Sequence, residues 1–169
     1  MAERLPALQV GASGPSAEAA AAASAAALGP DAPACNAGNR SAILVGVTGF
    51  KVRSGRVRVQ LYGGDAADFL AKGKKLRRID LPVTAAGPMN ICVAVPGPGT
   101  YAVAVRHDAD GNNRSGWTDG GGFSNNPKIS LLSLKPSHRS VAITVGRAIK
   151  PISVVLNYRS GFKIGPVGS

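Results

Sequence analysis

Hydrophobic and polar residues alternate with a period of two over much of the chain. In residues 56–62, Val57, Val59 and Leu61 share one face of an extended chain, while charged or polar residues occupy the other face. Because successive side chains of a β-strand point to opposite faces of a sheet, this alternation is typical of strands with one buried face. The same reasoning predicts seven short strands, at residues 43–47, 56–62, 79–83, 91–95, 101–105, 141–145 and 152–158.

Turn-forming residues separate these predicted strands. The chain contains 22 Gly and 12 Pro, and many of them stand between the alternating segments. Short strands with turns between them and one apolar face predict an all-β fold, an antiparallel seven-stranded β-sandwich of the immunoglobulin or transthyretin type. Residues 65–71 depart from this pattern and predict one short helical turn with Asp65 as its N-cap.

The first 34 residues differ from the rest of the chain. Residues 17–27 are mostly alanine, and they include no stripe of larger apolar side chains that could dock a helix. With 169 residues and 44% hydrophobic content, the remainder can build one ordinary core. We therefore divide the chain into a flexible or signal-like segment at residues 1–34 and a single β-sandwich domain at residues 35–169.

The N-terminal segment has the elements of a secretory signal. Arg4 supplies a positive charge, Ala19–Leu28 supplies a weak apolar stretch, and Ala32-Pro33-Ala34 supplies small residues for cleavage. This interpretation favours a periplasmic or secreted protein, and a flexible linker on a cytoplasmic protein is the alternative. No later segment is long and apolar enough to form a transmembrane helix.

The chain has two cysteines, Cys35 and Cys92, and no CxxC motif. Two thiols and the two distant histidines, His107 and His138, make a poor zinc set. In an oxidising compartment the two cysteines are expected to form a disulfide, whereas a cytoplasmic chain would keep two reduced thiols. The alternation of residues 91–95 places Cys92 on the outer face of its strand.

The chain is strongly basic, with 20 Lys+Arg, nine Asp+Glu, a formal charge of +11 and a pI of about 10.4. Such a field attracts polyanions, and an anionic glycan or a lipid headgroup are the expected partners. A run of bases over residues 72–78 could contact such groups or could simply blunt the edge of a sheet. The run has no interleaved aromatic residues, so no specific nucleic-acid binding is expected.

A loop almost free of aliphatic residues begins at the end of the fifth predicted strand and continues to about Pro127. Its oxygen-bearing side chains occupy positions 1, 3, 5 and 12 of a calcium-loop register. Position 6 is Asn113, which must adopt the left-handed conformation to complete the turn. The alternative is a set of metal-free turns in which these side chains bind backbone amides. The candidate calcium ligands are Asp108, Asp110, Asn112 and Asp119.

Four further residues in or beside this loop are candidate ligand contacts. His107 follows the apolar face of its strand, and it is either a core histidine held by a neighbouring aspartate or a ligand contact. Trp117 and Phe123 flank the loop tip, where they could stack on a sugar ring or a base, or close the end of the sandwich. Asn125 completes the set.

The sequence PGTYAVAVRHDADGN at residues 98–112 and the sequence GFSNNP at residues 122–127 resemble the signature of domain-of-unknown-function family 2141. The likeness covers roughly residues 42–159 and includes a final strand that ends Leu156-Asn157-Tyr158. The resemblance implies an exported bacterial protein with a transthyretin-like or carboxypeptidase-regulatory-like sandwich. The chain departs from the family pattern at residues 116–121, where no Pro-x-Glu precedes the GFS sequence, so no glutamate ligand is carried over.

No set of residues supports catalysis. Ser124 lacks the second glycine of a nucleophile elbow, and no acidic residue follows Asp119 to orient His138. We therefore expect a non-enzymatic, exported binding or structural module whose functional end is residues 108–126. One alternative is a polyanion-binding protein that uses its basic face. A weaker alternative is a hydrolase with its acids in residues 108–119.

Overall fold

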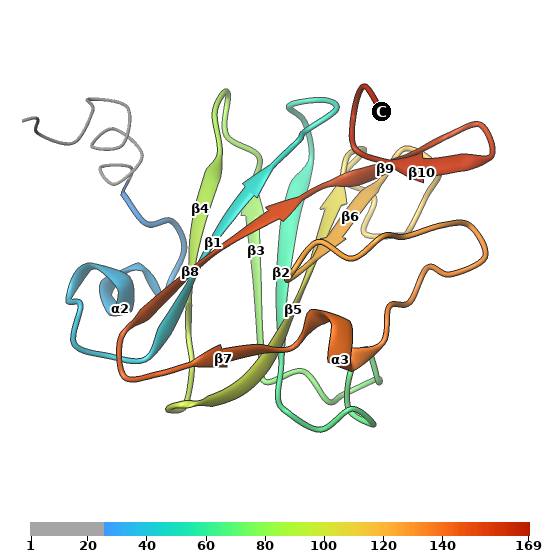
Figure 1. The fold of residues 1–169 in the computed structure, drawn as a ribbon. Coiled ribbons are helices and arrows are strands. Elements are labelled where there is room, and N and C mark those ends of the chain that lie inside the picture. Colours follow the sequence, from blue (N-terminus) through green and yellow to red (C-terminus); the bar gives the residue numbers. More distant parts are fainter. Residues whose placement is uncertain (1–25) are drawn as a thin grey trace, which may run out of the picture.

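The structure is a computed structural model that describes residues 26–169 (Figure 1). Of the predicted N-terminal segment, residues 1–25 lie outside the described residues and residues 26–34 lie within them. The described elements are α2 (Ala32–Asn36), β1 (Ala42–Thr48), β2 (Arg56–Tyr62), β3 (Arg77–Pro82), β4 (Met89–Ala94), β5 (Gly99–Asp108), β6 (Gly120–Phe123), α3 (His138–Val141), β7 (Ile143–Val145), β8 (Ile149–Val155), β9 (Asn157–Ser160) and β10 (Lys163–Gly165).

Two sheets form the sandwich. The smaller sheet has the order β4-β1-β8, in which β1 is antiparallel to β4 and parallel to β8. The larger sheet has the order β10-β9-β6-β5-β2-β3, and β7 pairs with the start of β5. The predicted all-β sandwich is therefore confirmed. The strand number and pairing need correction, because β1 to β10 replace seven strands and one pair is parallel.

The predicted strand at residues 152–158 is two strands that belong to different sheets. β8 pairs with β1 as far as Val155, and the amide of Leu156 then donates to the carbonyl of Thr48 at 2.9 Å. The next residues, Asn157 and Tyr158, pair with β6 in the larger sheet. The chain thus crosses between sheets at the buried Leu156, as strands do at the corners of a sandwich (Figure 1).

Helical structure is sparse and lies elsewhere than predicted. Residues 65–71 form successive turns, in which Asp65 Oδ1 accepts from the amide of Ala67 at 2.9 Å as an N-cap residue would. The four-residue α3 begins after Ser137, whose side chain caps it. Neither α2 nor α3 is long enough to cross a membrane, and no other described helix is a candidate.

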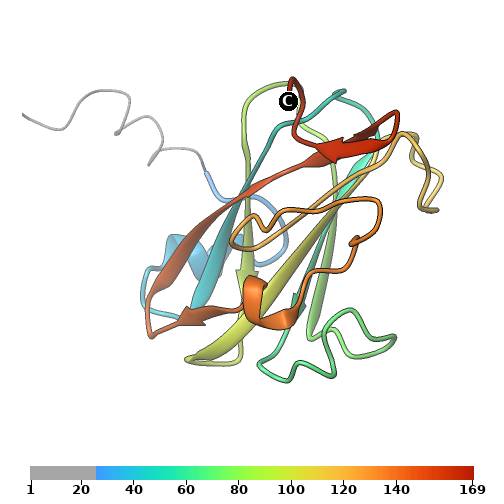
Figure 2. The same ribbon diagram turned by 45° about the vertical axis from the view of Figure 1, so that its right-hand side comes forward.

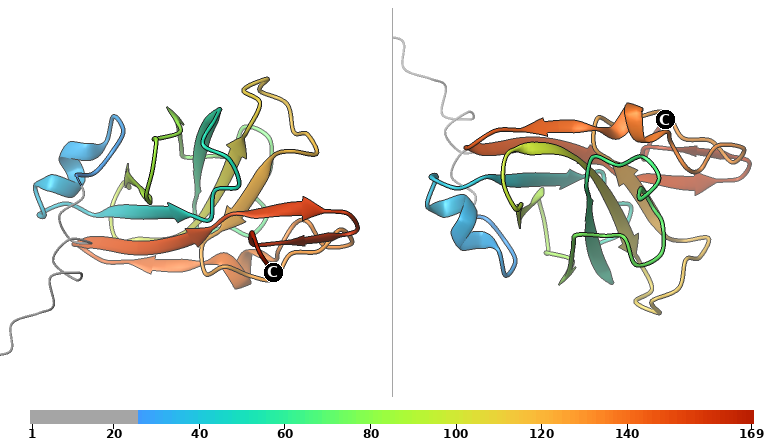
Figure 3. Two further views of the ribbon diagram at one scale, coloured as in Figure 1. Left: turned by 90° about the horizontal axis from the view of Figure 1, so that it is seen from above. Right: turned by 90° about the horizontal axis from the view of Figure 1, so that it is seen from below.

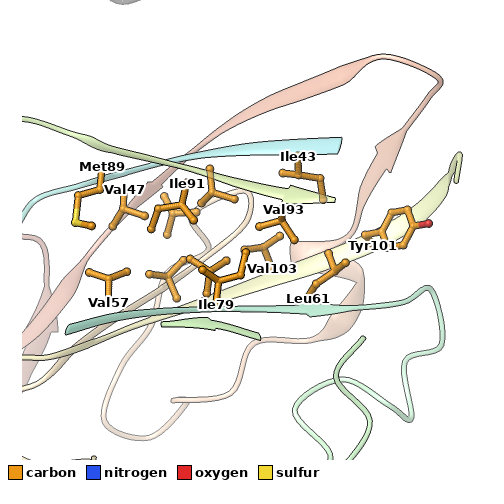
Figure 4. Packing of buried hydrophobic residues seen from close by; sticks show 14 of the residues in the cluster. Ile43, Val47, Val57, Leu61, Ile79, Met89, Ile91, Val93, Tyr101 and Val103 are labelled. Atoms are coloured by element: carbon orange, nitrogen blue, oxygen red, sulfur yellow. The ribbon is translucent and has the colours of Figure 1, made fainter. Parts of the chain in front are cut away.

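An aliphatic core fills the space between the two sheets (Figure 4). Alternate residues of β1 and β4 face alternate residues of β2, β3 and β5, as the period of two predicts. Each member is at most 7% exposed, so the core excludes water throughout. The largest contributors with almost no exposure are Ile43, Leu61, Met89, Ile91 and Leu156.

A second, smaller cluster covers only part of the outer face of the larger sheet. It unites the outward residues of β2 and β5 with Phe69 and with Val141 of α3. Phe69 packs edge-on against Tyr62 with a centroid distance of 5.5 Å. The outer face at the far end of β5, where Arg106 and Asp108 lie, is outside this cluster. That uncovered end carries the candidate functional site.

The residues before β1 are docked on the smaller sheet. The amide of Leu28 donates to the carbonyl of Asn90 at 2.7 Å, and its carbonyl accepts from the amide of Cys92 at 3.1 Å. The predicted disulfide is present between Cys35 in α2 and Cys92, with a Cα separation of 6.0 Å. The predicted boundary after Ala34 therefore falls inside α2, and Figure 3 shows this helix at one outer edge of the sandwich.

Asp31 links this N-terminal region to both sheets. Its carboxylate accepts from the amide of Ala94 at 3.0 Å in β4 and from Arg77 Nε at 2.9 Å in β3. Burial opposes the charged form, but these hydrogen bonds and the charge of Arg77 outweigh burial and lower the pKa of Asp31 below its usual value. The ionised carboxylate is therefore the form that stabilises the fold.

We expect Asp31→Asn to lower the free energy of unfolding by about 1 kcal/mol at neutral pH. Because the pKa of Asp31 is lower in the folded chain than in the unfolded chain, its contribution is present above the ordinary value of 3.8 and is lost as the pH falls through the folded value. Urea unfolding of the Asp31→Asn variant and of the unaltered chain, at about pH 7 and at about pH 3, measures the effect. A difference of equal size at both pH values would contradict this role.

Candidate functional site

A loop at residues 109–119 joins β5 to β6 on the uncovered end of the larger sheet. Asp108 is the last residue of β5 and Asp119 directly precedes β6, so the antiparallel pairing of the two strands brings both aspartates together. Gly111 and Asn113 have positive φ angles of 70° and 62°, which fold the loop tightly between them. The left-handed conformation predicted for Asn113 is confirmed.

Three of the four candidate calcium ligands converge in this loop. One carboxylate oxygen from each of Asp108, Asp110 and Asp119 lies within 4.8 Å of the others. The side chain of Asn112 is engaged differently, because its oxygen accepts from the amide of Arg114 at 2.7 Å and its Nδ2 donates to Asp110 at 2.7 Å. The loop thus concentrates negative charge on three oxygens of short side chains.

Backbone amides hold most of these carboxylate oxygens. Asp108 Oδ2 accepts from the amide of Asn113 at 2.8 Å, and Asp119 Oδ1 accepts from the amide of Ala109 at 3.1 Å. Asp108 Oδ1 is buried and has no hydrogen-bond partner among the described residues. Burial would raise the pKa of Asp108, but the hydrogen bond from the amide of Asn113 and the charge of Arg106 outweigh it and lower the pKa.

Arg106 is the cation nearest to this acidic cluster. Its Nη2 lies 3.6 Å from Asp119 Oδ2 and 3.9 Å from Asp108 Oδ2. Both Nε and Nη2 are buried without a hydrogen-bond partner in the part of the chain that the structure describes. Arg106 therefore balances one negative charge and keeps unused donors.

A groove of about 420 Å³ lies beside the loop on the outer face of β5, β6 and β9. Its floor includes Arg106, Gly121, Asn157 and Arg159. One wall is the end of the loop at residues 115–119, and the other wall is the segment between β6 and α3, which supplies Ile129, Leu131 and Leu134. Figure 2 shows this segment crossing in front of the larger sheet.

Trp117 stands at the rim of the groove with 71% of its surface exposed. The guanidinium carbon of Arg159 lies 3.2 Å from the centroid of its ring, so a cation–π contact joins the loop to β9. The interpretation of Trp117 as a plug that closes the sandwich is wrong, because its ring is mostly in solvent. Phe123 is half-buried, lines the groove and packs against Phe69 of the second cluster.

Three consecutive glycines in β6 shape the floor of the groove. A Cβ on Gly120 would lie 2.4 Å from Tyr158 Cε1, and a Cβ on Gly122 would lie 2.7 Å from Val154 Cγ1. Both positions face the interior, where neighbouring side chains pass directly over the backbone. A Cβ on Gly121 would meet nothing closer than the carbonyl oxygen of Val105 at 3.5 Å. Gly121 therefore leaves the groove floor open.

The predicted contacts His107 and Asn125 lie away from the groove. His107 is fully buried, and its Nδ1 and Nε2 lie 2.6 Å from the hydroxyl of Tyr158 and 2.7 Å from the carbonyl of Ser54. Because a carbonyl only accepts, Nε2 carries the proton and Nδ1 accepts from Tyr158. His107 is thus a core histidine whose partner is a tyrosine. Asn125 donates to the carbonyl of Ala142 at 2.9 Å and secures α3.

The basic run at residues 72–78 reaches the edge of the larger sheet and not the groove. Arg77 and Arg78 begin β3, which is the edge strand of that sheet. Arg78 Nε lies 2.6 Å from Asp80, and Lys74 lies 3.4 Å from Asp68. This supports the interpretation of the run as a charged sheet edge.

The sequence did not predict Arg106, Asn157 and Arg159 as site residues. Each occupies an outward position beside an inward apolar residue, which is the signal that marks a solvent-facing side chain. That signal does not say which strands are neighbours, and the β6–β9 pairing brings these residues together. The segment at residues 129–134 has no regular alternation that predicts a wall.

One family model matches the chain. The model, described as "Uncharacterized protein conserved in bacteria (DUF2141)", matches residues 45–153. Comparisons with curated proteins and with solved structures find no match. The family match spans more than half of the chain and confirms the resemblance seen in residues 98–112 and 122–127. The chain therefore belongs to this family.

Proposed function

We propose that this member of the DUF2141 family is a non-catalytic binding module that takes an acidic sugar unit in the groove beside Trp117. The observation that supports this best is one exposed aromatic ring together with two arginines, Arg106 and Arg159, on a single groove. An aromatic face packs against the C–H face of a sugar, and a guanidinium forms paired hydrogen bonds with a carboxylate. A ring-shaped ligand with an acidic substituent matches both.

The size and lining of the groove suit a small ligand. Its volume of about 420 Å³ is within the range of roughly 300–1,000 Å³ that is usual for small-molecule sites. Leu131 and Leu134 supply an apolar wall, while Asn157 adds a polar group to the floor. Such a mixture of apolar lining and few polar groups is what fixes the orientation of a ligand in a pocket.

The position of Arg106 favours an anionic ligand. Its side chain lines the groove and is 23% exposed. A ligand carboxylate could therefore approach the guanidinium and accept charge-assisted hydrogen bonds from it. The formal charge of +11 would also draw an anionic glycan toward the protein.

The module is proposed to be non-catalytic because its histidines are committed to structural bonds. His107 is buried beneath the sheet, and His138 Nε2 lies 3.0 Å from the carbonyl of Gly63. Asp119, which lines the groove, accepts hydrogen bonds from the backbone amides of Ala109 and Gly116. These commitments argue against the hydrolase alternative, since a general acid or base must reach its substrate.

The module is further proposed to act outside the cytoplasm, in the periplasm or after secretion. The disulfide between Cys35 and Cys92 supports this location, because such bonds persist in oxidising compartments. A cut after Ala34 would remove Leu28 and Asp31 from the sheet, so the proposed export requires that any leader end before Leu28.

Calorimetric titration with an oligouronic acid and with a neutral oligosaccharide of equal length tests the groove. We expect binding of the acidic oligomer only, and a loss of about tenfold or more in Arg159→Gln and in Trp117→Ala. Arg78→Gln, a change of the same kind at the sheet edge, is the matched control and should retain full affinity. Equal binding of the neutral oligomer, or binding to anionic lipid vesicles that the groove variants retain, would contradict the proposal.

A further inference from the structure

We propose that Asp108, Asp110 and Asp119 bind one calcium ion, which fixes the loop at residues 109–119 as a wall of the groove. The aspartates lie on the same outer face of the sheet as the groove, and Asp119 belongs to both features. The proposed site takes an inorganic ion and does not depend on the sugar proposed above.

The spacing of the oxygens fits a single ion. Calcium binds oxygen at about 2.3–2.6 Å, so two oxygens on the same ion are at most about 5 Å apart. The three carboxylate oxygens lie within 4.8 Å of one another. Each pair of oxygens therefore meets this limit, so small movements of the side chains, without rearrangement of β5 or β6, would bring all three to one ion.

A buried carboxylate oxygen without a hydrogen-bond partner is the second observation that favours a bound cation. The side chain of Asp108 is only 7% exposed, and its Oδ1 has no hydrogen-bond partner among the described residues. The backbone amide of Asn113 serves the other oxygen of the same carboxylate. Metal-free turns account for the carboxylate oxygens that accept hydrogen bonds from backbone amides, but they provide no partner for Asp108 Oδ1. A bound cation would satisfy it.

The local charge also calls for a divalent cation. Asp108, Asp110 and Asp119 carry three negative charges, and Arg106 is the cation paired with them in the described part of the chain. Two negative charges are left, which one divalent ion balances. With an ion in place, Arg106 would no longer be the main counter-charge of these acids.

The donor set selects calcium over other metals. The cluster consists of carboxylates alone, with no histidine or cysteine, and such hard oxygen donors suit calcium or magnesium better than zinc or copper. Calcium accepts an irregular arrangement of oxygens, such as the one that carboxylates on a loop present. Magnesium requires near-ideal octahedral geometry and keeps its water molecules.

Thermal unfolding and terbium luminescence of the full chain test the site. Terbium substitutes for calcium and is excited through a nearby tryptophan, and Trp117 is the one tryptophan in the sequence. We expect calcium to raise the melting temperature by mass action, magnesium to do so much less, and added calcium to quench the terbium signal. Asp110→Asn should weaken both responses at least about tenfold in metal concentration.

Asp110 is the residue to change because it is exposed and its replacement keeps the size of the side chain. Asp68→Asn, at a partly exposed carboxylate outside the cluster, is the matched control and should keep the full responses. The absence of a calcium shift in the unaltered chain, or equal shifts in Asp110→Asn and the unaltered chain, would overturn the inference. Because no sugar enters this experiment, its failure leaves the groove proposal standing, and the reverse also holds.

Discussion

Reduction of the disulfide between Cys35 and Cys92 is expected to lower the free energy of unfolding by about 4 kcal/mol. The two cysteines are 57 residues apart, so the bond closes a long loop in the unfolded chain and removes much of its conformational freedom. The same bond holds α2 and the docked Leu28 against β4, so its loss also frees the N-terminal edge. Urea unfolding with and without a reductant measures the change.

A chain with both cysteines replaced by serine provides the control for this measurement. It should be destabilised to a similar extent and should not respond to the reductant. A loss below about 1 kcal/mol would mean that the docked segment is held by its other contacts and that the unfolded chain gains little freedom.

Gly120→Ala is expected to destabilise the fold by about 1–3 kcal/mol or more, whereas Gly121→Ala should change it little. The added Cβ of the first variant would lie 2.4 Å from the ring of Tyr158, which must pass over Gly120 to bond His107. The same atom on Gly121 would meet its nearest neighbour at 3.5 Å, an ordinary contact. Urea unfolding of both variants compares adjacent positions of one strand, and equal losses would contradict this arrangement.

The fold was predictable from the sequence in those strands that bury one face and expose the other. Val57, Val59 and Leu61 alternate with charged residues, so the period of two identifies β2 and the direction of its side chains. β6 was not predicted because three of its four residues are glycine, which carries no apolar signal and has a low strand propensity. The split at Leu156 was not predictable either, since the apolar alternation continues unbroken from β8 into β9 while the pairing partner changes.

The candidate site was predictable only where it is contiguous in sequence. The aspartates of residues 108–119 lie on one loop, so their spacing alone predicts that they meet. The groove unites that loop with Arg159 and with residues 129–134, which come together through the β6–β9 pairing and the path of the chain before α3. His107 shows the converse, because its place after the apolar face of β5 suggested a core residue, while its partner Tyr158 comes from a distant strand.

The indole N–H resonance of Trp117 offers the most direct test of sugar binding in the groove. Because the chain has one tryptophan, this side chain gives a single, unambiguous signal in a nitrogen–proton correlation spectrum. Titration with an oligouronic acid is expected to move that signal in a saturable manner, and a neutral oligosaccharide of equal length should leave it in place. An indole signal that stays fixed while the acidic oligomer moves resonances of the sheet edge at β3 would contradict binding in the groove.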